Sequence, residues 1–429
     1  MARLLTVYGP PSTVFRFATP RRGVRFSPRA SALGSDGQHR SALKGHQNEG
    51  APSFLATPLV CRSVAPVLRL AFAAPNKTVE LDRRLKTVDS QRSKRGYPLL
   101  MIGRFTAALF SIAGLLAMLP ILSQAASPVA SATAIKESRH LVDAGKWDEA
   151  GKLLEEQLKR TKDTAEVARL RAELAHYAAD RNTYFQKNED SVREAIAVAR
   201  STVQGSGDNQ ALAILEMAEG RFTYFRALDK GGDWQAPTEH FDRALKTFGE
   251  LGDGIGLAEA MFYRGLVYQM QDQDKPAREM FDKGLELTNR TGDERMRSFI
   301  IRHIAYLQQK AGEIDLARTN FCESLRLRQQ NQMHLFVPFA LLVLAELELD
   351  QKNTAEAIKL TEEAILLSKS GNSPRALYSG QLLLAKLYSE VGRTAEAKNL
   401  GEQSRDGATA FGDVEASKEA EDFLQKHQG

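Results

Sequence analysis

The sequence has few of the residues that would stabilise a small, loop-rich or β-sheet domain. It has only two cysteines, Cys61 and Cys322, and nine of its fifteen prolines fall within the first hundred residues. No run of alternating apolar and polar residues longer than a few positions predicts a strand. A disulfide-rich scaffold is therefore excluded, and the body of the chain is expected to be all-α.

Catalytic and metal-binding patterns are also missing. The eight histidines do not pair with another histidine, a cysteine or a carboxylate at metal-ligand spacing. Gly252-Asp-Gly-Ile-Gly256 resembles a phosphate loop, but no strand precedes it and no Lys-Ser or Lys-Thr follows. Asp272-Gln-Asp274 lacks the glycine and terminal glutamate of a calcium loop. We expect no catalytic residue, no metal and no cofactor. We interpret His303 and His334 as residues on first helices that belong either to a groove wall or to a satisfied interface.

Residues 1–100 differ from the rest of the chain. They hold seventeen Lys and Arg against five acidic residues and have no sustained apolar period, so they are not expected to fold alone. Residues 101–429 carry forty-one basic and forty-eight acidic residues, a net charge of about −7. The folded part is therefore acidic, which argues against nucleic acid as a partner.

Residues 101–126 read as a secretory signal peptide. Arg104 gives a short positive region, residues 105–122 form an apolar run, and the small residues that follow offer a cleavage site. The alternative is an uncleaved membrane anchor, because eighteen apolar residues can just span a bilayer. Membrane attachment is expected only in that second case.

The position of this segment leaves two interpretations of residues 1–100. Translation can begin at Met101, which would make the preceding residues a gene-model extension and the protein an exported bacterial one, periplasmic or secreted. Otherwise the basic segment is a genuine targeting sequence, and the pair resembles the two-part import signal of a chloroplast-lumen protein. In a mature chain that begins near Ala126, Cys322 is alone, so we expect a packed thiol and no disulfide.

A forty-residue repeat organises the remainder, residues 127–429. Small residues recur at this interval in three rows, while Gly252-Asp253, Gly292-Asp293, Gly371-Asn372 and Gly412-Asp413 mark breaks. The three rows are Gly265, Ala305, Ala345 and Ala385; Ala277, Ala317, Ala357 and Ala397; and Gly284, Ser324, Ala364 and Ser404. A fixed period of this length is typical of stacked helical hairpins. Small side chains at three phased positions indicate where the paired helices cross closely.

These residues resemble the tetratricopeptide repeat. Gly265, Tyr268, Ala277 and Phe281 match its Gly, Tyr, Ala and Phe positions, and Ala305, Gly312, Ala317 and Phe321 match them in the next unit. The forty-residue period is longer than the family's usual thirty-four, and the closing proline is absent. The resemblance implies a right-handed superhelical solenoid of antiparallel helix pairs whose first helices line a concave groove.

We expect about fifteen helices, as seven pairs and a polar cap over residues 414–427. The first unit is expected around Gly145, Trp147 and Ala150. Two positions in the third unit break the pattern: Pro237 replaces a small residue in a first helical turn, and Phe225 stands where Gly265 predicts a small one.

The resemblance places a partner-binding groove on the first helices. Its expected residues are Tyr263, Gln269, Arg302, Tyr306, Gln309, Lys310, Glu346, Asp350 and Lys386. We therefore expect a non-enzymatic, exported scaffold that binds a peptide or protein in this groove. The alternatives are a membrane-anchored assembly factor and a hydrolase with an unrecognised site.

Overall fold

The computed structural model describes residues 61, 128–230 and 232–427, and within these ranges every regular element is a helix. Residues 128–427, apart from residue 231, contain fifteen helices, which follow one another as seven pairs and a final single helix, as expected. The predictions for residues 1–100 and 101–126 fall outside the described residues, apart from Cys61.

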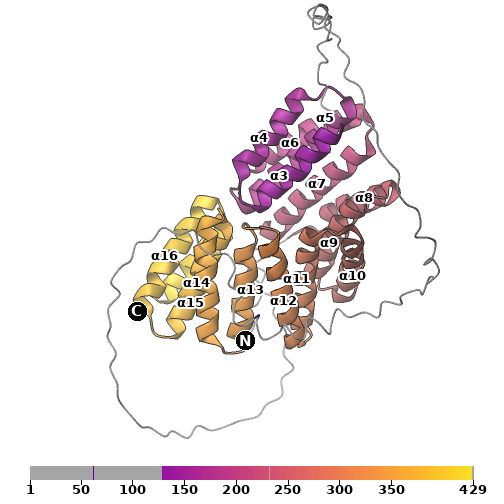
Figure 1. Ribbon diagram of the computed structural model, residues 1–429. Coiled ribbons are helices and arrows are strands. Elements are labelled where there is room, and N and C mark those ends of the chain that lie inside the picture. The colour runs from indigo at the N-terminus through magenta and orange to yellow at the C-terminus, as the bar shows by residue number, and fades with distance from the viewer. Residues whose placement is uncertain (1–60, 62–127, 231, 428–429) are drawn as a thin grey trace, which may run out of the picture.

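The pairs stack side by side in chain order (Figure 1). Their bounds are α3 Pro128–Asp143 and α4 Trp147–Arg160; α5 Thr164–Tyr184 and α6 Glu189–Ser206; α7 Asn209–Lys230 and α8 Gln235–Leu251; α9 Gly254–Met270 and α10 Asp274–Thr291; α11 Glu294–Lys310 and α12 Ile314–Gln330; α13 Val337–Asp350 and α14 Thr354–Ser370; α15 Pro374–Glu390 and α16 Thr394–Phe411; and the closing helix α17, Val414–Lys426. The expected all-α solenoid is confirmed.

The Gly-Asp breaks act as paired caps. Gly252, Gly292 and Gly412 have φ values of 68°, 72° and 90°, a left-handed conformation that ends a helix and favours glycine. The following residues Asp253 and Asp293 each accept a hydrogen bond from a backbone N–H of the next helix. One dipeptide thus ends one helix and begins the next.

The three rows of small residues lie at the helix crossings, as predicted. Ala277, Ala317 and Ala357 are fully buried. A Cβ added at Gly265 would lie 2.5 Å from Cε1 of Phe281, so even one extra carbon would collide with the paired helix. The spacing of the pairs is therefore fixed by the absence of side-chain volume at these positions.

The Phe225 irregularity has a local cause. In the third unit the residue that faces the aromatic ring of the paired helix is Gly220, whose added Cβ would lie 2.5 Å from Cε1 of Phe241. Helix α7 has 22 residues against 17 in α9, and the extra residues fall between Gly220 and Phe241. The count of forty therefore aligns Phe225 with the wrong residue of the helix, and Phe225 packs in the interior instead.

First helices line the inside of the row and second helices the outside. Twelve of the seventeen residues of α11 are buried, whereas only four of the eighteen residues of α10 are. His303 lies on α11, but His334 lies in the turn before α13, not on a first helix as we predicted. Helix α13 begins only at Val337, with Pro338 in its first turn, where proline's missing N–H costs no helical hydrogen bond.

The row curves until its first units contact units far along the chain. Arg295 Nε lies 2.6 Å from Asp143 Oδ2, and the backbone N–H of Leu335 donates to the carbonyl of Asp143 at 2.9 Å. Near the next turn, Asn372 Nδ2 donates to the carbonyl of Gly145 at 3.3 Å. Units of a solenoid ordinarily contact only their neighbours, so these contacts close the coil on itself.

A second set of contacts extends the closure to α5. Arg375 donates from its guanidinium to the carbonyl of Thr183 at 3.3 Å, and the Lys187 N–H donates to the carbonyl of Phe411 at 3.2 Å. The rings of Tyr184 and Phe336 meet edge to face with centroids 5.2 Å apart. We call the contacts of Asp143, Gly145, Thr183 and Lys187 with residues 295–411 the closure contacts.

Cys322 is bonded to Cys61 in a disulfide, and both residues are buried. The expectation of a packed, unpaired thiol is therefore wrong for the full-length chain. It assumed that the residues before Ala126 are lost, which removes Cys61 from consideration.

Candidate functional site

The predicted groove residues lie on four consecutive first helices, α9, α11, α13 and α15. We call this set of nine residues the inner strip: Tyr263, Gln269, Arg302, Tyr306, Gln309, Lys310, Glu346, Asp350 and Lys386. Five of them, Tyr263, Gln269, Arg302, Tyr306 and Glu346, are buried. Lys310 and Asp350 are exposed, while Gln309 and Lys386 are half-buried.

The buried members are held by contacts to neighbouring units. Gln269 shares a hydrogen bond of 2.8 Å with His303 Nδ1, and Arg302 donates to the Tyr306 hydroxyl at 2.8 Å. The guanidinium of Arg302 also lies 5.2 Å from the centre of the Tyr306 ring. These side chains therefore have packing roles as well as a place on the strip.

The more exposed members pair across units. Lys310 Nζ contacts Asp272 at 3.0 Å and Asp274 at 2.7 Å, which raises the pKa of the lysine against the opposing effect of burial. The pair Asp272 and Asp274 thus binds a lysine of the next unit. Gln309 donates to Asp350 at 3.3 Å, and Lys386 lies 2.7 Å from Glu419 of α17.

His303 does not resemble a catalytic base. Its imidazole is enclosed by the rings of Phe262, Phe281 and Tyr306, with centroid distances of 5.3, 5.8 and 5.4 Å. Burial lowers the pKa of His303 well below its usual value, and the positive charges of Arg302 and Arg328 lower it further. The ring is uncharged at neutral pH.

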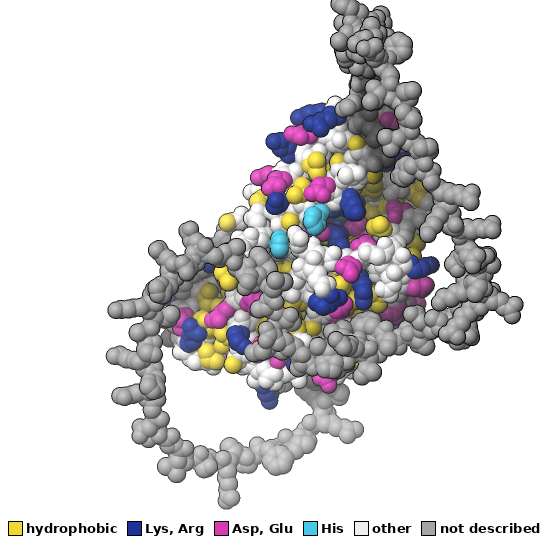
Figure 2. Space-filling model, viewed as in Figure 1, with side chains coloured by type: hydrophobic (Ala, Val, Ile, Leu, Met, Phe, Trp, Pro, Cys, Tyr) yellow, Lys and Arg dark blue, Asp and Glu magenta, His cyan; other side chains and the backbone are white. Residues whose placement is uncertain are grey.

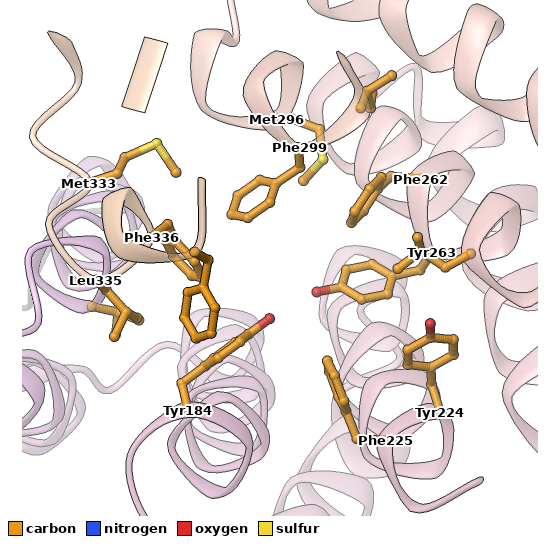
Figure 3. Close-up of a cluster of buried hydrophobic side chains, with 14 of the residues drawn as sticks. Tyr184, Tyr224, Phe225, Phe262, Tyr263, Met296, Phe299, Met333, Leu335 and Phe336 are labelled. Carbon is orange, nitrogen blue, oxygen red and sulfur yellow. The ribbon is translucent and has the colours of Figure 1, made fainter. Parts of the chain in front are cut away.

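Aromatic side chains fill the centre of the coil. Figure 3 shows Tyr184 of α5, Phe225 of α7 and Tyr263 of α9 converging with Phe299 of α11 and Phe336, which precedes α13. The Tyr184 and Tyr263 hydroxyls point into the space between them. A cavity of about 10 Å³ remains there, which is the space of about one water molecule.

A network of buried charges adjoins this aromatic centre, and sequence analysis did not find it. Arg139 of α3 binds both carboxylate oxygens of Glu173 at 2.7 Å and reaches Glu259 of α9 at 3.4 Å. Arg221 of α7 pairs with Asp180 of α5 and donates to Glu259 at 3.1 Å. The network joins the first four units through their inner faces.

Cations of the network lower the pKa of both Glu173 and Glu259, against the opposing effect of burial. Burial alone would raise the pKa of Glu259, but a hydrogen bond from His176 and the charges of Arg139 and Arg221 hold it well below its usual value. Breaking one partner of such a buried pair leaves an uncompensated charge. Loss of a single partner from the network would therefore destabilise the N-terminal half of the coil.

No periodic signal in the sequence could have located this network. Glu259 is the sixth residue of α9, whereas the sixth residue of α7 is the apolar Ile214, so the buried carboxylate does not recur at this position. The partners Arg139 and Arg221 do not share a register position, so the pairing itself left no periodic signal.

The face of the molecule that is visible in Figure 2 is mixed in charge. Figure 2 shows acidic and basic side chains interspersed over the visible face, with no broad patch of one sign. No group of three or more His, Cys, Asp or Glu side chains within residues 128–427 is placed to hold a metal ion. Among the helices described, none is long and apolar enough to cross a bilayer.

No family model matches the sequence, and no curated protein matches it. Among solved structures, a Rap protein complexed with Competence and Sporulation Factor has a TM-score of 0.53 and 14% identity, covering 70% of this chain and 87% of that one. NprR in complex with its cognate peptide NprX has a TM-score of 0.49 and 13% identity, with coverages of 69% and 80%. A tetratricopeptide repeat protein from Parabacteroides merdae has a TM-score of 0.41 and 15% identity, covering 70% of this chain and 100% of that one.

The likeness to the Rap protein shows a shared fold. Together with the buried rows of small residues and the paired helices, it identifies this chain as a tetratricopeptide-like helical-repeat solenoid.

Proposed function

We propose that this protein is an exported, non-enzymatic scaffold that binds a peptide or an extended segment of a partner protein along the inner strip. The observation that carries the proposal is the continuity of the strip across α9, α11, α13 and α15. The more exposed strip residues, Gln309, Lys310, Asp350 and Lys386, present donors, acceptors and charges of both signs, which recognition of an extended chain can use. The Rap protein of similar fold was solved with the factor it binds, which supports the same kind of role.

The test is capture of a partner from an envelope extract by the wild-type protein and by two matched variants. Lys386 on the strip and Lys359 on the outer helix α14 each pair with one glutamate, Glu419 and Glu356. We expect the Lys386→Glu protein to fail to capture the partner that the wild-type protein captures, and the Lys359→Glu protein to capture it normally. A partner captured equally by both variants would place the binding surface away from the strip.

A hydrolase acting through an unrecognised site is the competing function. The buried, uncharged His303 and the pairing of the carboxylates in the network favour the scaffold instead. We expect the purified protein to show no turnover in a screen of peptide and cell-wall substrates. Turnover that survives repurification would replace the scaffold proposal.

Export is the second part of the proposal, and it depends on the sequence of residues 101–126. We expect amino-terminal sequencing of the protein from cells to begin near Ala126. Recovery of residues 101–122 in the mature product would favour the membrane-anchored assembly factor. Detection of residues 1–100 in a precursor would show translation upstream of Met101, as the targeting-sequence interpretation requires.

A further inference from the structure

In the part of the chain that the structure describes, every buried acidic side chain but one has a partner. Ten Asp or Glu side chains are buried among the described residues. Eight of them pair with an arginine: Asp143, Glu166, Glu173, Asp180, Glu219, Glu259, Glu323 and Glu348. Asp413 accepts hydrogen bonds from the Tyr378 hydroxyl and the Ala416 N–H. The tenth, Glu346, has neither an ion pair nor a hydrogen bond within the described residues.

The exception lies on the inner strip. Glu346 is 9% exposed and belongs to α13, the third of the four helices that form the strip. Only two residues further along, Glu348 is 2% exposed and lies 2.9 Å from Arg318 of α12. The same helix therefore holds one buried carboxyl with a partner and one without.

The charged groups that face Glu346 are Arg302 of α11, Lys386 of α15, Asp350 of α13 and Glu419 of α17. The two cations have other partners, since Lys386 is bonded to Glu419 and Arg302 to Tyr306. Burial raises the pKa of Glu346 to about 8, against the opposing effect of Arg302 and Lys386. A cation that arrives from outside the chain would stabilise the charged form of this buried carboxyl, which has no ion-pair partner among the described residues.

We propose that Glu346, with Asp350 one helical turn further along α13, receives a lysine or arginine side chain of the bound partner segment. Residues four apart lie on the same face of a helix, so the two carboxyls can share one ammonium or guanidinium group. The inference rests on the proposed function. It specifies that the bound segment has a basic residue at the position that contacts Glu346 and Asp350.

Proton linkage gives the proposal a distinctive signature. Below about pH 8 the arriving cation must displace a proton from Glu346, so affinity rises with pH, by up to about tenfold per pH unit. Above about pH 8 the carboxyl is already charged and the affinity is constant. A partner without a basic residue would show no such dependence.

The experiment uses fluorescent heptapeptide pools with Arg, Lys, Gln or Glu at the central position and measures anisotropy from pH 6 to pH 9. We expect the wild-type protein to prefer the Arg and Lys pools by about tenfold or more at pH 8. Glu346→Gln should abolish both the preference and the pH dependence. Glu286→Gln, on the exposed face of α10, is the control and should behave as wild type.

The outcomes separate the inference from the function it rests on. Equal binding of all pools, or an unchanged preference in Glu346→Gln, overturns the inference while leaving a peptide-binding strip intact. No binding by any pool, or binding that Lys386→Glu does not alter, contradicts the proposed function and the inference with it.

Discussion

At the scale of single residues, Glu346 affects stability as well as recognition. Its pKa is about 8 in the folded protein, against an ordinary value of 4.5. Below pH 4.5 the carboxyl is protonated in both the folded and unfolded states. Between pH 4.5 and about 8 the unfolded chain releases the proton while the folded chain keeps it. The free energy of unfolding therefore falls with rising pH by ~1.4 kcal/mol per pH unit from this group alone.

We expect Glu346→Gln to remove this loss of stability. The amide resembles the protonated carboxyl in shape, so the variant should match the wild type near pH 4.5 and become progressively more stable than it up to about pH 8. Urea unfolding at a series of pH values measures the difference. A constant difference from pH 4.5 to pH 8 would show that Glu346 ionises normally.

The small residues at the crossings give a second prediction at this scale. Ala357 is fully buried where α13 and α14 cross, whereas Ala355 of the same helix is exposed. Ala357→Leu should overpack the crossing and lower the free energy of unfolding by about 1 to 3 kcal/mol, while Ala355→Leu should be nearly neutral. Equal melting temperatures for the two variants would refute the assigned crossing.

At the scale of elements, α7 shows how a repeat tolerates extra length. Its additional residues move the close approach from the expected position to Gly220 and leave Phe225 free to pack in the centre of the coil. The helix pair remains antiparallel because the glycine still lies against Phe241. The helix crossing at Gly220 is therefore the same as in the other units, while the inward-facing side chains, such as Phe225, differ.

The close approach at Gly220 predicts opposite effects for two glycines of one unit. Gly220→Ala places a Cβ 2.5 Å from Cε1 of Phe241 and should destabilise the protein by about 1 to 3 kcal/mol. Gly249→Ala lies in α8 with open space around its Cβ and should stabilise it by about 0.5 to 1 kcal/mol. Thermal unfolding of both variants tests the prediction, and a stabilising Gly220→Ala would contradict it.

At the scale of the whole molecule, the closure contacts distinguish this coil from an open array. Asp143 lies at the end of α3 and binds Arg295 of α11, 152 positions further along the sequence. The side chain of Asp143 is almost fully buried where it pairs with Arg295. Removing this carboxylate leaves the Arg295 guanidinium without its ion-pair partner, which is costly in a buried site.

We expect Asp143→Ala to lower the free energy of unfolding by about 3 to 5 kcal/mol and to increase the radius of gyration. Small-angle scattering and urea unfolding measure the two effects. The double variant Asp143→Ala with Arg295→Met removes both charges and should recover part of the stability. An unchanged radius in Asp143→Ala would mean that the other closure contacts hold the coil without it.

The parts of this structure that could be predicted are those that depend on nearby residues. Gly292 and Asp293 cap adjoining helices, and Ala317 is buried because its own helix pair needs it to be small, so the periodic pattern locates both. The Asp143–Arg295 pair, the Arg139–Glu259 contact and the Cys61–Cys322 bond join residues more than a hundred positions apart. No periodicity marks such contacts, because each occurs once.

The closure also limits how the chain can vary in length. Repeat arrays commonly gain or lose whole units, since each unit needs only its neighbours. One additional pair of helices between α4 and α11 would displace Arg295 from Asp143 by roughly 16 to 20 Å, twice the spacing of packed helices. Duplication or deletion of a repeat would therefore break the closure contacts. The number of units between α4 and α11 is fixed because the coil must bring Asp143 back to Arg295.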